Sequence, residues 1–215
     1  VSDLKTYIGS VTGKVEGTYF TGSLLVGHST TGDLEELDEA TYNTGVGINA
    51  MNSITTGDNN TCVGYNSGKE MTSSTANTII GSSSGVLMTT STGNTIIGAS
   101  SGTAISGTTG TSNTNNTIIG YDAGNSLDSS STDQATENVI IGTKAGNSGT
   151  NNLATGSNCI IIGYNANSSA ADVNDEITLG NSSITSLRCA DTTIASLSDR
   201  RDKTDIIDST YGTDF

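Results

Sequence analysis

The residues with the clearest chemical potential lie close together in the stretch SLSDRRDKTDI at 196–206. Ser198 supplies a hydroxyl and Lys203 an amine, with Asp199 and Arg201 between them. A serine hydroxyl is a weak nucleophile that needs an adjacent base, and lysine is a base only as its neutral amine. The lysine pKa, about 10.4 in water, must therefore fall by several units, which burial and nearby arginines favour. By spacing alone, a solvated polar junction between domains is the favoured interpretation.

Three tyrosines form a second group of candidates, because Tyr65, Tyr121 and Tyr164 each directly follow a glycine of a recurring motif. These rings are suited to stacking on sugars, and a packed tyrosine row with hydroxyls at its rim is the alternative. A glycosidase needs a pair of carboxylates that flank the bond it cleaves. The acidic residues of this chain form no such pair at equivalent positions of the motif. We therefore expect no turnover of an external substrate.

The cysteines and the overall charge exclude several classes of function. Cys62, Cys159 and Cys189 are odd in number and lack metal-type spacing, and two of them occupy motif positions, which favours packing over disulfide or metal chemistry. We predict no metal and no cofactor. The formal net charge of −14 provides no basic face for nucleic acid. No apolar run approaches the roughly 20 residues of a membrane span, so we expect no membrane insertion.

The element that positions these candidates is a repeat that ends in glycine. It reads NTIIG at 77–81, 94–98 and 116–120, with variants such as NTCVG, NVIIG and CIIIG. Successive closing glycines are 17 residues apart in four cases and 20 to 22 apart in the others, at positions 27, 47, 64, 81, 98, 120, 142, 163 and 180. A period this short predicts a solenoid in which each repeat is one coil.

Each repeat is predicted to contain a short strand, since Ile and Val occur in runs bounded by Gly and Asn without a helical stripe. The two hydrophobic residues before each glycine are adjacent, so on a strand they point to opposite faces. One side chain packs inside the coil, and the other must be covered from outside. Neighbouring copies of the chain are the simplest cover, which predicts a cyclic homo-oligomer. The repeated asparagines are expected to stack from coil to coil.

The chain is predicted to be all-β, with four regions: a β shaft at 1–22, the repeat solenoid at 23–185, a connector at 186–197 and a further segment at 198–215. Three longer segments between the motifs, 103–115, 125–137 and 147–157, are candidates for receptor recognition because loops on a rigid scaffold often bind partners.

The repeats, over about residues 23–185, resemble the β-roll heads of trimeric autotransporter adhesins and the related repeats of phage tail fibres. The hexapeptide SDRRDK resembles the start of the endosialidase-type intramolecular chaperone domain found at the C-terminus of phage tail fibres and tailspikes. This resemblance implies a homotrimer and a single self-cleavage between Leu197 and Ser198. It maps the nucleophile to Ser198 and the base to Lys203, with Asp199 and Arg201 at the other fixed positions of the motif.

The resemblance further implies a distal segment of a tail fibre or tailspike that binds a host-surface receptor, either a glycan or an outer-surface protein. Its expected location is the virion, joined to the rest of the phage tail and extracellular after release. The chain ends far short of a complete chaperone domain, so we expect a fragment of a longer protein. Alternatives are a bacterial trimeric adhesin head, a polysaccharide-degrading tailspike, and an ice-binding solenoid built on threonine rows that include Thr61, Thr78, Thr95 and Thr117.

Overall fold

The computed structural model describes residues 13–17, 20–26, 40–106, 112–127, 134–149 and 151–188. The chain divides into two compact units, Val1–Ser183 and Ile184–Phe215. The first unit contains every described strand and all of the motifs that end in glycine. The second unit is described only as far as residue 188. Its candidate cleavage residues, Leu197, Ser198, Asp199, Arg201 and Lys203, lie outside the described residues.

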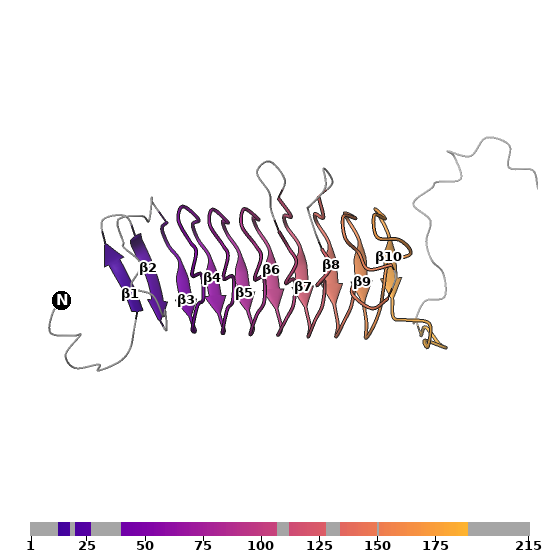
Figure 1. Cartoon of the computed structure of the whole chain (residues 1–215). Coiled ribbons are helices and arrows are strands. Elements are labelled where there is room, and N and C mark those ends of the chain that lie inside the picture. Colours follow the sequence, from indigo (N-terminus) through magenta and orange to yellow (C-terminus); the bar gives the residue numbers. More distant parts are fainter. Residues whose placement is uncertain are drawn as a thin grey trace, which may run out of the picture. The chain divides into compact units, whose positions relative to one another are not determined.

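The described strands belong to one ten-stranded sheet whose spatial order follows the sequence (Figure 1). The first two strands pair antiparallel, and from the second onward every neighbouring pair is parallel. The strands are β1 Gly13–Gly17, β2 Phe20–Val26, β3 Thr44–Val46, β4 Thr61–Val63, β5 Thr78–Ile80, β6 Thr95–Ile97, β7 Thr117–Ile119, β8 Val139–Ile141, β9 Ile160–Ile162 and β10 Ile177–Leu179.

The prediction of an all-β solenoid is confirmed. Strands pair in register, so that Thr61 lies beside Thr78 and Thr78 beside Thr95, one coil further along. Hydrogen bonds between equivalent positions join residues 17 apart in the regular coils and 22 apart where a segment is inserted. Insertions therefore lengthen a coil without changing the register of its strand.

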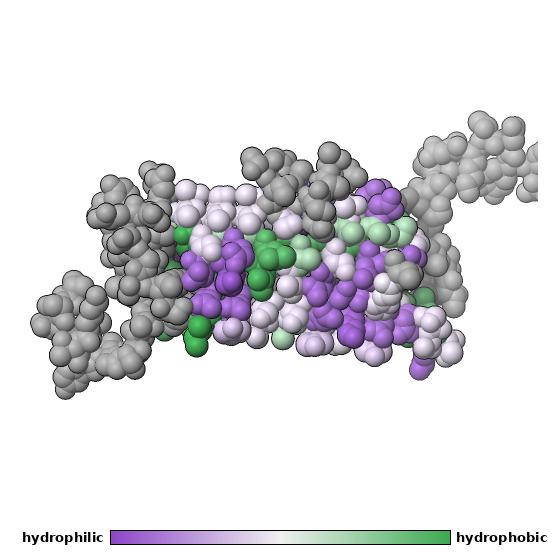
Figure 2. All heavy atoms as spheres, in the orientation of Figure 1, coloured by the Kyte–Doolittle hydropathy of each residue, from purple (hydrophilic) through white to green (hydrophobic). Residues whose placement is uncertain are grey.

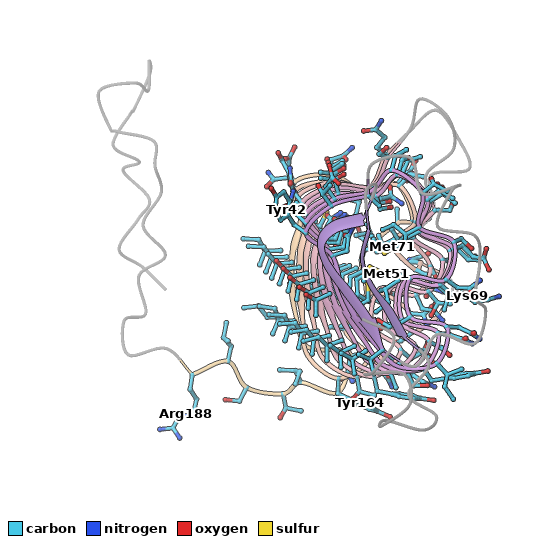
Figure 3. All side chains as sticks on the ribbon, turned by 90° about the vertical axis from the view of Figure 1, so that its left-hand side faces the viewer. Tyr42, Met51, Lys69, Met71, Tyr164 and Arg188 are labelled. Atoms are coloured by element: carbon cyan, nitrogen blue, oxygen red, sulfur yellow. The ribbon has the colours of Figure 1, made fainter. Side chains whose placement is uncertain are left out.

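The core is a narrow channel enclosed by the coils. The middle residue of each strand points inward, and Ile79, Ile96, Ile118, Ile140 and Ile161 are fully buried. A second inward row closes the channel from the opposite wall, with Ile54, Met71, Met88, Ile105, Leu127 and Leu153 as its members. Figure 3 looks into the coil and places Met51 and Met71 inside it, while Lys69 projects outward. Two rows of large side chains are enough to fill the channel.

In one coil, the large and the small residue are interchanged between the strand and the turn, relative to the neighbouring coils. Where the next five coils have a larger strand residue and a glycine in the turn, this coil has Gly45 in the strand and Met51 in the turn. A Cβ atom on Gly45 would lie 3.0 Å from Met51 Cε. In the next coil, a Cβ atom on Gly68 would lie 2.8 Å from Cys62 Sγ. These two neighbouring coils therefore each hold one bulkier group at this level of the channel, in opposite positions.

The closing glycines are required where consecutive coils approach each other most closely. Gly81 has a φ of 143°, and a Cβ atom there would lie 2.3 Å from the carbonyl oxygen of Gly98. No side chain fits in that space, and the backbone conformation itself is one that other residues rarely adopt. The glycine at the end of each motif therefore sets the close stacking of the coils.

A ladder of buried asparagines runs along the inside of the coils, as the sequence analysis predicted. Oδ1 of Asn77 accepts hydrogen bonds from the backbone N–H and the side-chain Nδ2 of Asn94, at 2.9 and 3.1 Å. Nδ2 of Asn94 also donates across its own coil to the carbonyl oxygen of Asn113, at 3.0 Å. The same pattern joins Asn43, Asn60, Asn77, Asn94, Asn116 and Asn138. The ladder ends at Cys159, whose N–H donates to Oδ1 of Asn138.

We predict that Asn94→Asp lowers the free energy of unfolding by about 3–5 kcal/mol at neutral pH, because it places an unpaired charge among buried acceptors. The oxygen that replaces Nδ2 would face Oδ1 of Asn77 and the carbonyl oxygen of Asn113, to which Nδ2 now donates. Chemical denaturation followed by circular dichroism measures the change. Asn59→Asp is the matched control, since Asn59 is exposed. Equal stability of the two variants would contradict a structural role for the ladder.

Candidate interaction surface

The outer face of the parallel sheet carries two straight rows of side chains. Figure 3 shows these ladders projecting from the wall of the coil between Tyr42 and Tyr164. The last residue of each strand forms the first row, which runs through Val46, Val63, Ile80, Ile97, Ile119, Ile141, Ile162 and Leu179. The first residue of each strand forms the second row, which runs through Thr44, Thr61, Thr78, Thr95, Thr117, Val139, Ile160 and Ile177. These two rows are called the outer sheet face below.

The outer sheet face carries no charge from β3 to β10: its first row is aliphatic, and its second row is threonine from β3 to β7 and aliphatic from β8 to β10. Ile80 is 39 % exposed, whereas its inward neighbour Ile79 is fully buried. Exposure is highest at the last strand, where Ile177 and Leu179 are 66 % and 53 % exposed. The sequence prediction that adjacent hydrophobic residues point to opposite faces is therefore confirmed. Contiguous exposed apolar surface of this kind marks sites of interaction with other proteins.

The opposite side of the coil has a different character. Figure 2 views the solenoid from the side that carries Lys69 in Figure 3, and hydrophilic residues cover much of it around a smaller hydrophobic patch. Lys69 Nζ and Glu70 Oε1 form an ion pair there at 2.9 Å. Leu87 occupies the position of Glu70 in the neighbouring coil and is 46 % exposed. Charged groups are thus present on this side and excluded from the outer sheet face.

The second row was only partly recognised from the sequence. Its threonines were considered as a possible ice-binding row, but they end at Thr117, since Val139, Ile160 and Ile177 take the equivalent position in the later strands. The first residue of the strand is aliphatic in each of the last three strands. Comparing that position between repeats would have revealed the extended apolar face.

Tyr65, Tyr121 and Tyr164 lie at the same corner of the coil, directly after the closing glycine, and are 53 %, 56 % and 65 % exposed. Ser82 and Ala99 occupy this position in the two coils between Tyr65 and Tyr121. With coils about 4.8 Å apart, the rings of Tyr65 and Tyr121 are about 14 Å apart along the solenoid. The tyrosines therefore form separate exposed rings and not a packed row.

The three candidate recognition segments are described only in part, because 107–111, 128–133 and 150 lie outside the described residues. Ile105 and Leu127, near the start of the first two segments, belong to the second inward row, whereas Leu153 of the same row follows residue 150 in the third segment. Asn113 and Ala135 mark equivalent points where the first two segments rejoin the coil, and both are buried. The first two segments therefore leave the solenoid at the same point of successive coils, directly after the second inward row, whereas the third is inserted before that row.

Both described cysteines are buried and free, in agreement with their predicted packing role. Burial raises the pKa of the Cys62 thiol to about 12, against a small opposing effect of its hydrogen bond with Ser67. Burial is also the main cause of the raised pKa of Cys159. Cys189 lies outside the described residues. Within the described ranges, no group of His, Cys, Asp and Glu side chains is arranged to hold a metal, and no helix is long and apolar enough to cross a membrane.

We predict that Cys62 makes the protein less stable in alkali. The thiol has a pKa of about 12 in the folded state against a reference value of 9.0. Its contribution to stability is therefore fully present below about pH 9 and is lost as the pH rises toward 12. The free energy of unfolding should fall over this range, as measured by chemical denaturation.

Cys62→Ile is the matched control, because Ile79 and Ile96 occupy the same position in the next two coils. This variant should lose the part of the alkaline decrease that comes from Cys62. An identical pH dependence for the two proteins would contradict the prediction.

Comparison of the chain with protein-family models, with curated proteins and with solved structures finds no match. The geometry therefore carries the functional argument by itself. Its main feature is a rigid solenoid with one uncharged, apolar, exposed face.

Proposed function

We propose that this chain is the distal segment of a phage tail fibre or tailspike, which assembles as a homotrimer, binds a host-surface receptor and matures by self-cleavage before Ser198. The observation that carries the proposal is the outer sheet face, whose two uncharged rows extend from β3 to β10. A monomeric fibre segment would expose this face to water. A segment that packs against copies of itself would bury it.

Self-association explains where the charges lie. The chain has a formal net charge of −14, which disfavours random association of whole molecules. Side chains on the outer sheet face add nothing to that repulsion, because none of them is charged. Three copies arranged around a common axis would bury their faces together and leave the charged sides in solvent. Cyclic symmetry closes such an assembly and prevents open-ended growth.

Self-cleavage gives the charged hexapeptide a role in the same assembly. In this proposal, Lys203 as a neutral amine takes the proton of the Ser198 hydroxyl, and the Ser198 oxygen attacks the carbonyl carbon of Leu197. The peptide C–N bond then breaks and the Ser198 nitrogen takes up the proton, which leaves Leu197 joined to Ser198 as an ester. Water hydrolyses this ester, so that one chain ends at Leu197 and the other begins at Ser198. Cleavage after assembly would release the folding aid. The trimer would then be kinetically trapped, so that its lifetime would depend on its unfolding rate.

We predict that Ile80→Lys prevents trimer formation while the solenoid remains folded. The variant places a charge in the middle of the outer sheet face, where assembly would bury it beside its symmetry copies. Light scattering should give the mass of three 21.7-kDa chains for the wild type and of one chain for the variant. Circular dichroism should be unchanged.

Leu87→Lys is the matched control, because Leu87 is similarly exposed and lies on the other side of the same coil. This variant should remain trimeric. A monomeric wild-type protein, or a trimeric Ile80→Lys variant, would refute the proposed assembly.

We further predict that mass spectrometry of the full-length gene product finds a chain that ends at Leu197. Ser198→Ala removes the nucleophile and Lys203→Arg keeps the charge but removes the base, so both products should remain uncut. Ser196→Ala is the control and should be cut normally. A wild-type product that keeps its C-terminal piece would rule out self-cleavage but would leave the trimer untouched.

A further inference from the structure

The second row of the outer sheet face changes its chemistry along the solenoid. It consists of threonine from β3 to β7 and of Val139, Ile160 and Ile177 in β8, β9 and β10. The first row is aliphatic in all of these strands. Within the outer sheet face, only β8–β10 therefore carry aliphatic side chains in both rows, and these three strands are called the aliphatic end below.

The fold itself does not require this change. Thr117 in β7 pairs in register with Val139 in β8, and Val139 pairs in the same way with Ile160 in β9. All three side chains are β-branched and suit a strand. All three are also partly exposed, so a threonine at positions 139 and 160 would serve a monomeric solenoid equally well. The aliphatic side chains at these positions indicate a contact outside the coil.

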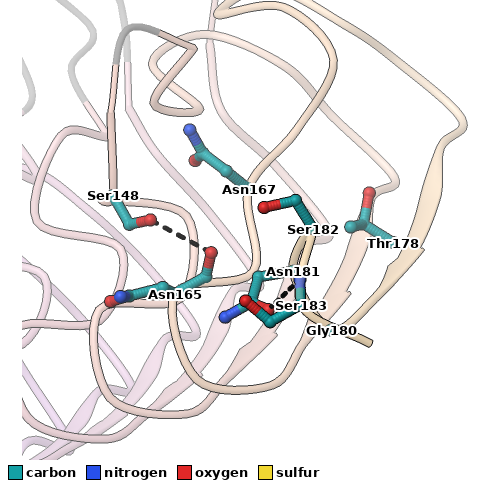
Figure 4. A pocket seen from close by; sticks show the side chains of 8 residues that line it. All are labelled: Ser148, Asn165, Asn167, Thr178, Gly180, Asn181, Ser182 and Ser183. Carbon is teal, nitrogen blue, oxygen red and sulfur yellow. Dashed lines mark hydrogen bonds between the residues drawn. The ribbon is translucent and has the colours of Figure 1, made fainter. Parts of the chain in front are cut away.

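The last coils of the first unit are polar away from the outer sheet face. Figure 4 shows a pocket there, and all eight residues that line it are serine, threonine, asparagine or glycine, among them Asn165, Asn167 and Ser182. Ile177 and Leu179, by contrast, are both more than half exposed on the outer sheet face. The exposed aliphatic surface of β10 is thus specific to this face.

Cyclic symmetry determines which coils face each other in the proposed homotrimer. Rotation about an axis parallel to the rows involves no shift along the solenoid, so each coil lies level with the same coil of the other copies. Three flat faces around one axis form a triangular prism. The two rows are about 7 Å apart on each strand, so the first row of one copy meets the second row of the next along each edge of the prism.

The two parts of the face differ in how closely such rows can pack. In β9, Ile162 would meet Ile160 of the partner subunit, and two hydrocarbon side chains can exclude water from their contact. In β6, Ile97 would meet Thr95 of the partner subunit. A threonine hydroxyl that loses its water costs free energy unless it finds a hydrogen-bond partner, which an isoleucine side chain does not provide. The threonine strands therefore favour a contact that retains water.

We propose that the aliphatic end holds the copies of this chain together. A dry contact between its two rows provides most of the association free energy, and the threonine strands β3–β7 pack against one another with water between them. This inference rests on the proposed homotrimer and locates the main contact within the outer sheet face.

Identical substitutions in the two parts of the face test the proposal. Ile162→Thr and Ile97→Thr replace the same side chain in the same row, in β9 and in β6. Light scattering of the full chain, equilibrated over a dilution series, gives the concentration at which half of the trimer dissociates. Ile162→Thr should raise this concentration at least tenfold, because it introduces a hydroxyl into the dry contact. Ile97→Thr should change it less than threefold, and circular dichroism of both variants should be unchanged.

Cysteine pairs test which residues meet between copies. In a Cys189→Ser background, Ile177→Cys combined with Leu179→Cys places one thiol in each row of β10. Mild oxidation should then give covalent trimers in denaturing electrophoresis. Ile177→Cys combined with Val46→Cys is the matched control, because Val46 lies in β3 at the opposite end of the first row, and it should give no covalent trimers.

Equal effects of Ile162→Thr and Ile97→Thr on a trimeric protein would overturn this inference. Failure of the β10 pair to crosslink would also overturn it, as would covalent products from the control pair, which indicate antiparallel copies. Each of these outcomes leaves the oligomer itself in place. A monomeric wild-type chain would instead refute the proposed homotrimer and this inference with it.

Discussion

The hydrogen-bonded stacking of one coil on the next is the constraint on which the rest of this structure depends. Each ladder asparagine before Asn138 spans its own coil and also accepts from the backbone and side chain of the following asparagine, as Asn77 does from Asn94. Because these amides are buried, any change of register would leave several polar groups without partners. The ladder therefore fixes the alignment of the strands. All side-chain rows, inside and outside, are straight as a consequence.

Straight rows have opposite consequences on the two faces of the sheet. Inside, they let a small inventory of Ile, Leu, Met and Cys fill a narrow channel completely, although the chain is only 32 % hydrophobic and has no Trp. Outside, they align exposed aliphatic side chains into a continuous surface. A short coil has too little interior to bury both hydrophobic residues of its strand. The short coil that makes the solenoid possible therefore leaves one hydrophobic face exposed for other chains to cover.

In this view, attachment, assembly and maturation depend on different parts of one chain. Under the proposed function, the outer sheet face would serve assembly, the exposed corner tyrosines would be available for recognition, and the segment around Ser198 would carry the self-cleavage. A rigid, repetitive scaffold suits this division, because substitutions on one row do not disturb the others. Symmetry would also multiply a weak single-site contact with a receptor.

The sequence by itself determined the β-solenoid, the length of its coil, the asparagine ladder and the opposite orientation of adjacent hydrophobic residues such as Ile79 and Ile80. All of these follow from local periodicity, which is readable along the chain. Only the tertiary structure revealed the exchange of bulk between Gly45 and Met51, the separation of Tyr65 from Tyr121, and the pocket lined by Asn165, Asn167 and Ser182. These features depend on contacts between coils. Residues from different coils meet there at positions that no single repeat specifies.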